Sequence, residues 1–224
     1  MLVPKQGMSD LVSRLEEKLV RNLGSRFIKG LPIQELPDAA NVVLTIPAYK
    51  ALPIFEKEFP RLAEKLRAVE YTPIVSVTAF VKRDALPKDL RGVGVLLPAT
   101  EKRTSLGVLF MSSSFPGRVS DESQYASFTI MMGGSAKPDW VNATDEQISS
   151  VVQQELRDII GLREKPVELV INRWPNAIPR YSTELPEMWA TARETWCQTP
   201  GHVLFGNYTG QVSMRGMIEA AATM

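Results

Sequence analysis

The sequence Ile74-Val75-Ser76-Val77-Thr78-Ala79-Phe80-Val81-Lys82 begins a region in which the hydrophobic period changes from about 3.6 residues to two. A period of two is typical of β-strands, because successive side chains point to opposite faces of a sheet. The region runs to Gly134 and contains three further candidate strands, at 93–97, 105–113 and 125–132. The connections between these strands are too short for crossover helices, so we predict that sequential neighbours pair antiparallel.

Helical patterns flank this region on both sides. Residues 9–23 carry apolar side chains at the spacing of one helical face, with Ser9 as N-cap and Gly24 as stop. Residues 144–147, Thr-Asp-Glu-Gln, form a capping box that opens a helix ending at Gly161. The remaining predicted elements are helices at 49–69, broken near Pro60, at 186–197 and after residue 213, and strands at 41–46, 167–173 and 202–205. This order predicts an α+β fold with a mixed, mostly antiparallel sheet and flanking helices.

The composition excludes several classes of protein. The 224 residues include 26 Lys and Arg against 25 Asp and Glu, so the chain lacks the basic balance of a nucleic-acid-binding protein. One His and one Cys cannot assemble a Cys/His zinc site, and we predict no metal centre. We interpret Cys197 as a small packed thiol and His202 as a turn residue. No apolar run approaches the length of a bilayer span, which predicts a cytoplasmic protein, or one peripheral on the inner membrane.

Two segments near the C-terminus carry distinctive local patterns. In Trp174-Pro175-Asn176-Ala177-Ile178-Pro179-Arg180-Tyr181, two prolines fix an irregular backbone, and the Trp face suits packing against a flat ring. In the second segment, Val203-Leu204-Phe205-Gly206 leads through a turn to a helix that starts after Ser213. The N-terminus of such a helix presents N–H groups to an anion or a ring carbonyl. By composition alone, the first segment also fits a core Trp under a rigid loop, and the second fits an ordinary strand–turn–helix connection.

The two segments together resemble the C-terminal part of the protoporphyrinogen oxidase family, flavoenzymes of the flavin-containing amine oxidase superfamily. In the second segment the resemblance covers Gly206-Asn207-Tyr208-Thr209-Gly210-Gln211-Val212-Ser213. The other matching motifs are spread over nearly the whole chain: Gly7-Met8-Ser9-Asp10-Leu11, Val43-Leu44-Thr45-Ile46-Pro47-Ala48, Arg83-Asp84-Ala85-Leu86-Pro87, Gly92-Val93-Gly94-Val95-Leu96-Leu97-Pro98, Ser113-Ser114-Phe115-Pro116-Gly117-Arg118 and Met131-Met132-Gly133-Gly134.

The resemblance implies an FAD-dependent oxidation of protoporphyrinogen IX to protoporphyrin IX in haem biosynthesis. The cofactor carries this chemistry, so no catalytic side chain is expected. By matched position, the implied FAD-binding residues are Trp174, Asn207, Tyr208, Gly210, Val212, Ser213 and Met214. The implied contacts to the apolar faces of the tetrapyrrole are Val93, Leu96, Phe115 and Met131, for which packing within the sheet core is the alternative. The sequence departs from the family pattern at Val93, Gln211, Arg215 and Gly216.

The resemblance also predicts what the chain lacks. Members of the family begin with a G-x-G-x-x-G turn that holds the FAD pyrophosphate, whereas Gly92-Val93-Gly94 here lacks the third glycine. A second gap falls at 31–40, where relatives carry a longer strand pair. We therefore interpret the chain as the C-terminal portion of the enzyme and expect it to bind FAD weakly or not at all by itself. The predicted divisions are a remnant of the FAD-binding lobe at 1–48, a substrate-binding domain at 49–181, and a C-terminal helix with the flavin-facing strand–turn–helix at 182–224.

Two alternative functions stay open at this point. One is a non-catalytic module that binds a tetrapyrrole or an enzyme partner. The other is a flavin amine oxidase relative, whose amine substrates usually meet an aromatic pair facing the flavin; only Tyr208 suggests one side of such a pair. The expected partners are a tetrapyrrole substrate and no nucleic acid, while peripheral membrane association of the full-length enzyme and a homodimer remain open.

Overall fold

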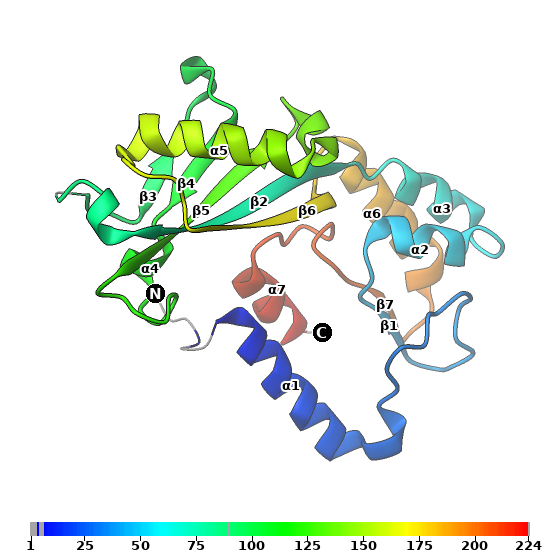
Figure 1. The fold of residues 1–224 in the computed structure, drawn as a ribbon. Coiled ribbons are helices and arrows are strands. Elements are labelled where there is room, and N and C mark those ends of the chain that lie inside the picture. The colour runs from blue at the N-terminus through cyan, green and yellow to red at the C-terminus, as the bar shows by residue number, and fades with distance from the viewer. Residues whose placement is uncertain (1–3, 5–6, 89, 224) are drawn as a thin grey trace. The chain divides into compact units, whose positions relative to one another are not determined.

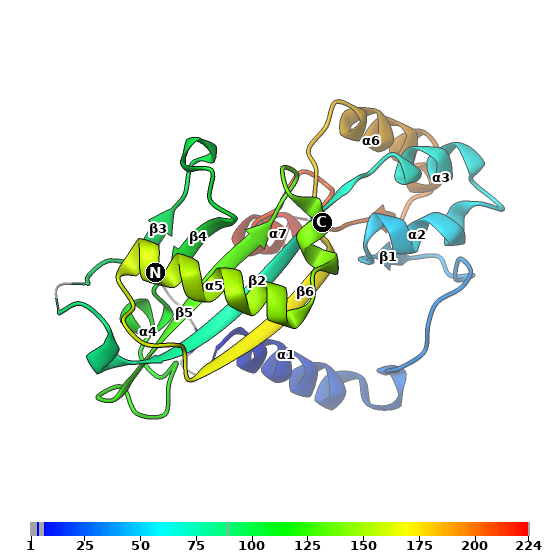
Figure 2. The same cartoon turned by 45° about the horizontal axis from the view of Figure 1, so that its top comes forward.

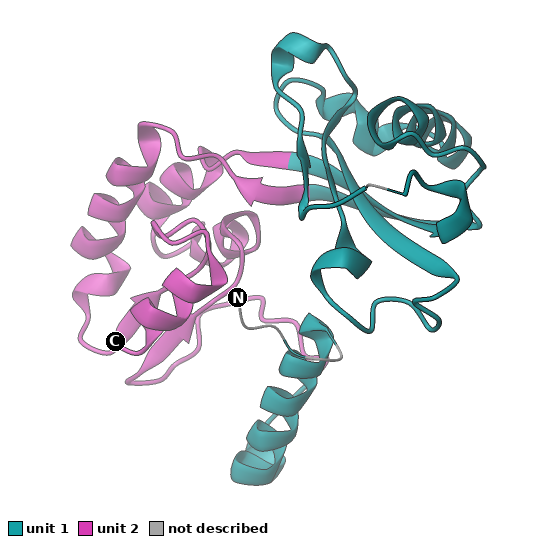
Figure 3. Cartoon of the chain, turned by 90° about the vertical axis from the view of Figure 1, so that its left-hand side faces the viewer, with its two compact units in different colours: residues 1–29, 73–175 teal, residues 30–72, 176–224 magenta. Residues whose placement is uncertain are grey.

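The computed structural model of the chain describes residue 4, residues 7–88 and residues 90–223. The chain forms two compact units, each built from segments far apart in the sequence. Figure 3 shows them in different colours: the first is residues 1–29 with 73–175, and the second is residues 30–72 with 176–224.

These units differ from the divisions predicted at residues 48 and 181. The helices α2 (Ala48–Phe55) and α3 (Pro60–Arg67) pack with α6 (Glu184–Glu194), and so belong with the C-terminal segment. The reason is hydrophobic burial, because the apolar faces of these three helices share one core that is separate from the core of the large sheet.

The first unit contains most of a five-stranded sheet with the strand order β3-β4-β5-β2-β6 (Figure 1). Its strands are β2 (Tyr71–Lys82), β3 (Gly94–Leu96), β4 (Ser105–Leu109), β5 (Tyr125–Gly133) and β6 (Glu168–Pro179). The β3–β4 and β4–β5 pairs are antiparallel, as predicted. The expectation that β2 would pair with β3 is wrong, because β2 pairs antiparallel with β5. With 12 residues, β2 can form a long ladder with the 9 residues of β5, whereas β3 has only 3.

Helix α5 (Asp145–Ile160) covers one face of this sheet, as Figures 1 and 2 show. The predicted capping box is present: Thr144 Oγ1 accepts a hydrogen bond from Gln147 N–H, and Gln147 Oε1 accepts one from Thr144 N–H. Gly161 ends the helix with a positive φ of 68° that a glycine adopts easily. The core between helix and sheet includes Val75, Val77, Ala79, Phe128, Ile130, Ile148, Val152 and Leu156.

One buried carboxylate ties α5 to the start of β4. Glu155 is 6% exposed and accepts hydrogen bonds from Thr104 N–H at 2.6 Å, from Ser105 N–H at 2.9 Å and from the Ser105 hydroxyl. A charged acceptor with several donors is the usual way to bury a carboxylate.

Two predicted strand boundaries differ from the structure. Strand β4 ends at Leu109 and is followed by the short helix α4 (Met111–Ser114), because Phe110 turns into the core and packs edge-to-face on Phe128 at 5.4 Å. Strand β6 continues to Pro179 through the segment that was expected to be irregular. Because β6 is the edge strand of the sheet, its prolines need not donate to a second neighbour.

Helix α1 (Met8–Leu23) confirms the predicted N-terminal helix, but its N-cap is Gly7 and the predicted N-cap, Ser9, lies inside the helix. None of its residues is buried, and two of its apolar residues, Val12 and Leu15, are more than half exposed. Among the described residues, no helix combines the length and the apolar character required to cross a membrane.

The second unit is built around a small parallel pair of strands, β1 (Val42–Leu44) and β7 (His202–Leu204). The predicted break near Pro60 is present between α2 and α3, and α7 (Met214–Ala221) is the terminal helix. The largest buried side chains of this core are Phe55, Leu62, Leu66, Met188, Trp196 and Tyr208.

The lone cysteine and the lone histidine both belong to this second unit. Cys197 is half-buried against the core, and burial raises the pKa of its thiol. His202 is the first residue of β7, and its ring stacks on Trp196 with 4.9 Å between ring centres. Among the described residues, no group of three His, Cys, Asp or Glu side chains is placed to hold a metal ion.

Candidate functional site

The second unit has a pocket where its two parallel strands end. Because β1 and β7 are parallel, the residues that follow them emerge at the same edge, where α7 also begins. The pocket has a volume of about 610 Å³. It is lined by Thr45, Ile46, Pro47, Phe205, Gly206, Asn207, Val212, Met214, Met217, Ile218 and Ala221, and we call it the α7 pocket.

Three residues predicted to contact FAD, Asn207, Val212 and Met214, line the α7 pocket. Ser213 is the N-cap residue of α7. Its Oγ accepts a hydrogen bond from Gly216 N–H at 3.0 Å, which stabilises the start of the helix. Gly210 adopts a φ of 93° and has no atom within 4 Å of where a Cβ would stand. The turn before α7 therefore stays open at this glycine.

Tyr208 is not among the residues that line the pocket, and the flavin contact expected for it stays a prediction. Its ring is fully buried in the core, and its hydroxyl donates to the Ile46 carbonyl at 3.2 Å. Burial raises the pKa of this phenol well above the usual tyrosine value. Tyr208 thus fixes the strand end that carries Ile46.

The α7 pocket suits the ring portion of a flavin. Its walls are largely apolar, and the first turn of α7 has N–H groups that lack intrahelical acceptors. Such groups favour the carbonyl or anionic edge of a bound ring. Within the described residues, no glycine-rich turn accompanies the pocket to hold a pyrophosphate, so the fit extends to the ring portion alone.

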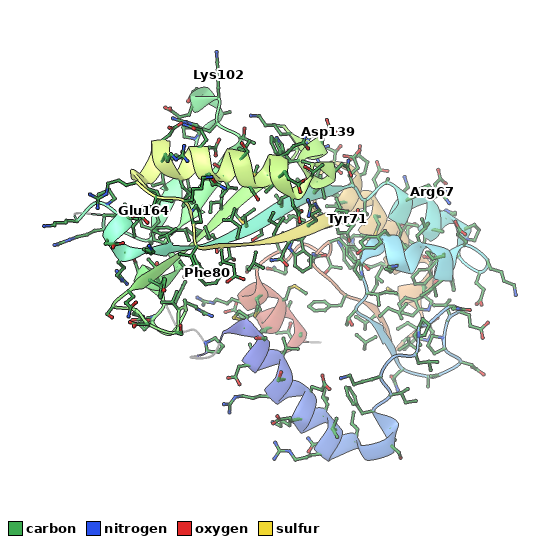
Figure 4. All side chains as sticks on the ribbon, in the orientation of Figure 1. Arg67, Tyr71, Phe80, Lys102, Asp139 and Glu164 are labelled. Atoms are coloured by element: carbon green, nitrogen blue, oxygen red, sulfur yellow. The ribbon has the colours of Figure 1, made fainter. Side chains whose placement is uncertain are left out.

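The first unit offers a second surface, the face of the sheet away from α5. Residues paired across antiparallel strands point to the same side, and Thr78 pairs with Thr129, which pairs with Leu109. In the same way, Gly107 lies between Met131 and Leu96. We call this surface the open face, defined by Thr78, Phe80, Leu96, Leu109, Thr129, Met131, Val170 and Trp174; Figure 4 labels Phe80 on it.

Strand β6 contributes to the open face by alternation. Leu169 and Ile171 pack against the core beneath α5, and Arg173 forms an ion pair with Asp145 at the start of α5. The β6 side chains that alternate with these three, including that of Trp174, therefore point to the open face. Trp174 is 57% exposed on this face.

The open face brings together two of the four residues predicted to contact the tetrapyrrole, Leu96 and Met131. Val93 comes just before β3 and lies three residues from Leu96, so alternation along the strand places the two side chains on opposite faces. Phe115 follows α4 and lies beyond the strands. Phe80 and Leu109 were missed, although their alternation with Ala79 and Val108 was a usable signal.

The predicted FAD-binding residues divide between the two units. Trp174 belongs to the first unit, and the other six belong to the second. The expectation that Trp174 packs near the same cofactor as Asn207 therefore stays a prediction.

The sequence matches the family model described as flavin containing amine oxidoreductase over residues 29–223. Protoporphyrinogen oxidase 2 of Arabidopsis thaliana is 27% identical over 179 residues, which cover 77% of this chain and 35% of that protein. The chain thus spans about a third of the length of the curated relatives it matches.

Two solved structures share this fold. One, from Exiguobacterium sp. and assigned as a protoporphyrinogen oxidase, superposes with a TM-score of 0.73 at 19% identity, covering 98% of this chain and 50% of that one. Cyclohexylamine oxidase from Brevibacterium oxydans gives 0.72 at 15% identity, covering 97% and 52%. The fold is therefore shared by proteins named for quite different substrates.

Proposed function

The chain belongs to the flavin-containing amine oxidoreductase family, and we propose that it is the C-terminal portion of an FAD-dependent protoporphyrinogen oxidase. In this role the whole enzyme oxidises protoporphyrinogen IX to protoporphyrin IX in haem biosynthesis. The similarity to protoporphyrinogen oxidases over most of the chain supports the choice of this reaction within the family.

The observation that carries the proposal is the open face. A tetrapyrrole is a broad, largely apolar ring, and it needs a surface that is apolar over a comparable width. The open face presents Leu96, Leu109 and Trp174 with exposed fractions of 83%, 41% and 57%, respectively. Solvent-exposed apolar side chains gathered on one sheet face are typical of a ligand-binding or interaction surface.

The residues of the chain would then position the substrate and hold the flavin ring, without a nucleophile or general base of their own. The side chains of the open face would remove water from one side of the macrocycle as it binds. The α7 pocket would take the flavin ring, with Val212 and Met214 as apolar contacts and the first turn of α7 directed at a polar ring edge. When bound, FAD supplies the acceptor for the hydride that leaves the substrate.

Two observations bear on the alternative functions. The burial of Tyr208 removes the residue that suggested an aromatic pair for amine substrates, which favours the macrocycle over an amine. The absence of a G-x-G-x-x-G motif from the sequence is compatible with a module that binds the tetrapyrrole without catalysing its oxidation. For the full-length enzyme, peroxide release with protoporphyrinogen, compared with release with polyamines, distinguishes the macrocycle oxidase from the amine oxidase.

Titration of protoporphyrin IX into the full chain tests the proposal through the shift of the porphyrin absorption band. We expect saturable binding with one porphyrin per chain. Leu96→Asp places a carboxylate on the open face and should weaken binding by about tenfold or more, because one leucine side chain contributes roughly 1.5–3 kcal/mol on burial. The matched control is Val12→Asp on α1, which is also an exposed apolar position and should bind as the wild type does. Equal weakening by both substitutions, or no saturable binding, would contradict the proposal.

A further inference from the structure

Three hydroxyl-bearing side chains hold the turn between β7 and α7. Thr209 Oγ1 accepts a hydrogen bond from Gly206 N–H at 3.2 Å, and the Tyr208 ring is fully buried in the core of the second unit. The third side chain is that of Tyr181, whose hydroxyl donates to the Asn207 carbonyl at 2.6 Å. Of the three, Tyr181 alone lies outside residues 206–210, so it holds the turn from a different part of the chain.

The Tyr181 hydroxyl contacts both ends of this turn. Burial raises the pKa of the Tyr181 phenol, and a hydrogen bond from the Gly210 backbone N–H to the same oxygen opposes part of that rise. Asn207 and Gly210 are the first and fourth residues of a four-residue turn, and the C=O and N–H of such residues are the groups that close a β-turn. One hydroxyl therefore serves a backbone acceptor and a backbone donor together.

The turn determines the shape of the α7 pocket. It carries Asn207, which lines the pocket, and it leads directly to Val212 and Met214, which also line it. At its far end, Gly210 has no atom within 4 Å of where a Cβ would stand, and glycine restricts the backbone less than any other residue. The contact from Tyr181 therefore supplies a restraint that the residues of the turn do not supply themselves.

The backbone beneath Tyr181 is itself fixed. Tyr181 follows the end of β6, and the preceding residue, Arg180, donates its N–H to the Glu70 carbonyl at 2.8 Å. The Arg180 guanidinium also forms an ion pair with the Glu70 carboxylate at 2.6 Å. A tyrosine side chain has only two rotatable torsions before its ring, so a hydroxyl on this base holds a position well.

We propose that Tyr181 is a positioning residue for the flavin ring in the α7 pocket. The inference rests on the proposed function, because that function places the ring in this pocket. Tyr181 acts through Asn207 and Gly210 and does not itself need to touch the ring. A pocket that is already held in its binding shape loses less conformational entropy when the ligand enters, so the hydroxyl should contribute to affinity.

Titration of the full chain with FMN, followed by flavin fluorescence, tests this role. FMN carries the flavin ring on a soluble side chain without the adenine half, and we expect weak, saturable binding. Tyr181→Phe removes only the hydroxyl and should weaken FMN binding about fivefold, equivalent to about 1 kcal/mol, while leaving the affinity for protoporphyrin IX unchanged. The matched control is Tyr49→Phe, which removes the hydroxyl of another partly exposed tyrosine of the second unit and should change neither affinity.

One carbonyl resonance reports directly on the hydrogen bond. Asn207-Tyr208 is the only Asn–Tyr step in the sequence, so a chain labelled with ¹³C at asparagine carbonyls and with ¹⁵N in tyrosine gives a single amide–carbonyl cross-peak, from Asn207. We expect this carbonyl resonance to move upfield in Tyr181→Phe and to stay in place in Tyr49→Phe. A tyrosine that only stabilised the second unit would lower the melting temperature without changing the FMN affinity of the fully folded chain.

The outcomes separate this inference from the proposed function. Equal FMN affinities of the wild type and Tyr181→Phe overturn the role of Tyr181 and leave the proposed function intact. An equal loss of FMN and porphyrin binding in Tyr181→Phe also overturns it, because such a loss reflects a general disruption of the fold. Absence of FMN binding by the wild type overturns both this inference and the placement of the flavin ring in the α7 pocket. Absence of porphyrin binding alone overturns the tetrapyrrole proposal and not the role of Tyr181.

Discussion

The substitution Glu155→Gln tests how α5 holds the start of β4, a strand of the sheet that carries the open face. The carboxylate of Glu155 accepts two backbone N–H groups and one hydroxyl in a buried site. Glutamine has the same shape, but it replaces one acceptor oxygen by an NH₂ group, so at least one backbone donor of Thr104 or Ser105 loses its acceptor. A hydrogen bond to a charged group contributes about 1.5–3 kcal/mol, and we therefore expect a loss of about 2–3 kcal/mol in the free energy of unfolding.

Thermal unfolding followed by circular dichroism measures this loss. For a chain of this length, 1 kcal/mol corresponds to about 2–4 °C, so the melting temperature should fall by about 4–12 °C. The control Glu101→Gln makes the same chemical change at an exposed position in the β3–β4 connection and should have an effect within about 0.5 kcal/mol. A melting temperature of Glu155→Gln that matches the control would refute the reasoning about the buried carboxylate.

Two further predictions concern the second unit. Tyr208→Phe removes the hydrogen bond to Ile46 and should cost about 1 kcal/mol at neutral pH in urea unfolding. Because burial raises the pKa of Tyr208, the unfolded chain releases this proton first; wild-type stability should then fall as pH rises above about 10, and should fall less steeply in Tyr208→Phe. Ser213→Ala removes the α7 cap, and amide exchange at 214–221 should accelerate about fivefold, whereas Ser213→Asn should exchange at nearly the wild-type rate.

Local sequence patterns were sufficient to predict much of the fold. The capping box at Thr144 and the stop at Gly161 bounded α5 within a residue, because both signals act through hydrogen bonds to adjacent backbone. The pairing of β2 with β5 was missed, because ladder length is a property of two distant strands and not of either alone. The grouping of α2 and α3 with α6 was missed for a similar reason, since a core shared by distant segments leaves no mark in either segment.

The site was predicted less completely than the fold. Leu96 and Met131 came from family resemblance, and alternation along the strands would have added Phe80 and Leu109. The burial of Tyr208 was not predicted, because a motif position does not tell whether a ring faces a ligand or the core.

Nuclear magnetic resonance of the methionine methyl groups during titration with protoporphyrin IX tests the central claim most directly. Met131 and Met132 are adjacent in β5 but point to opposite faces, Met131 to the open face and Met132 to the core beneath α5. A porphyrin stacked on the open face should shift the Met131 methyl strongly through its ring current, in a one-to-one titration, and leave Met132 almost unchanged. Met131→Leu assigns the resonance. A Met131 methyl that does not move at saturating porphyrin would contradict the account.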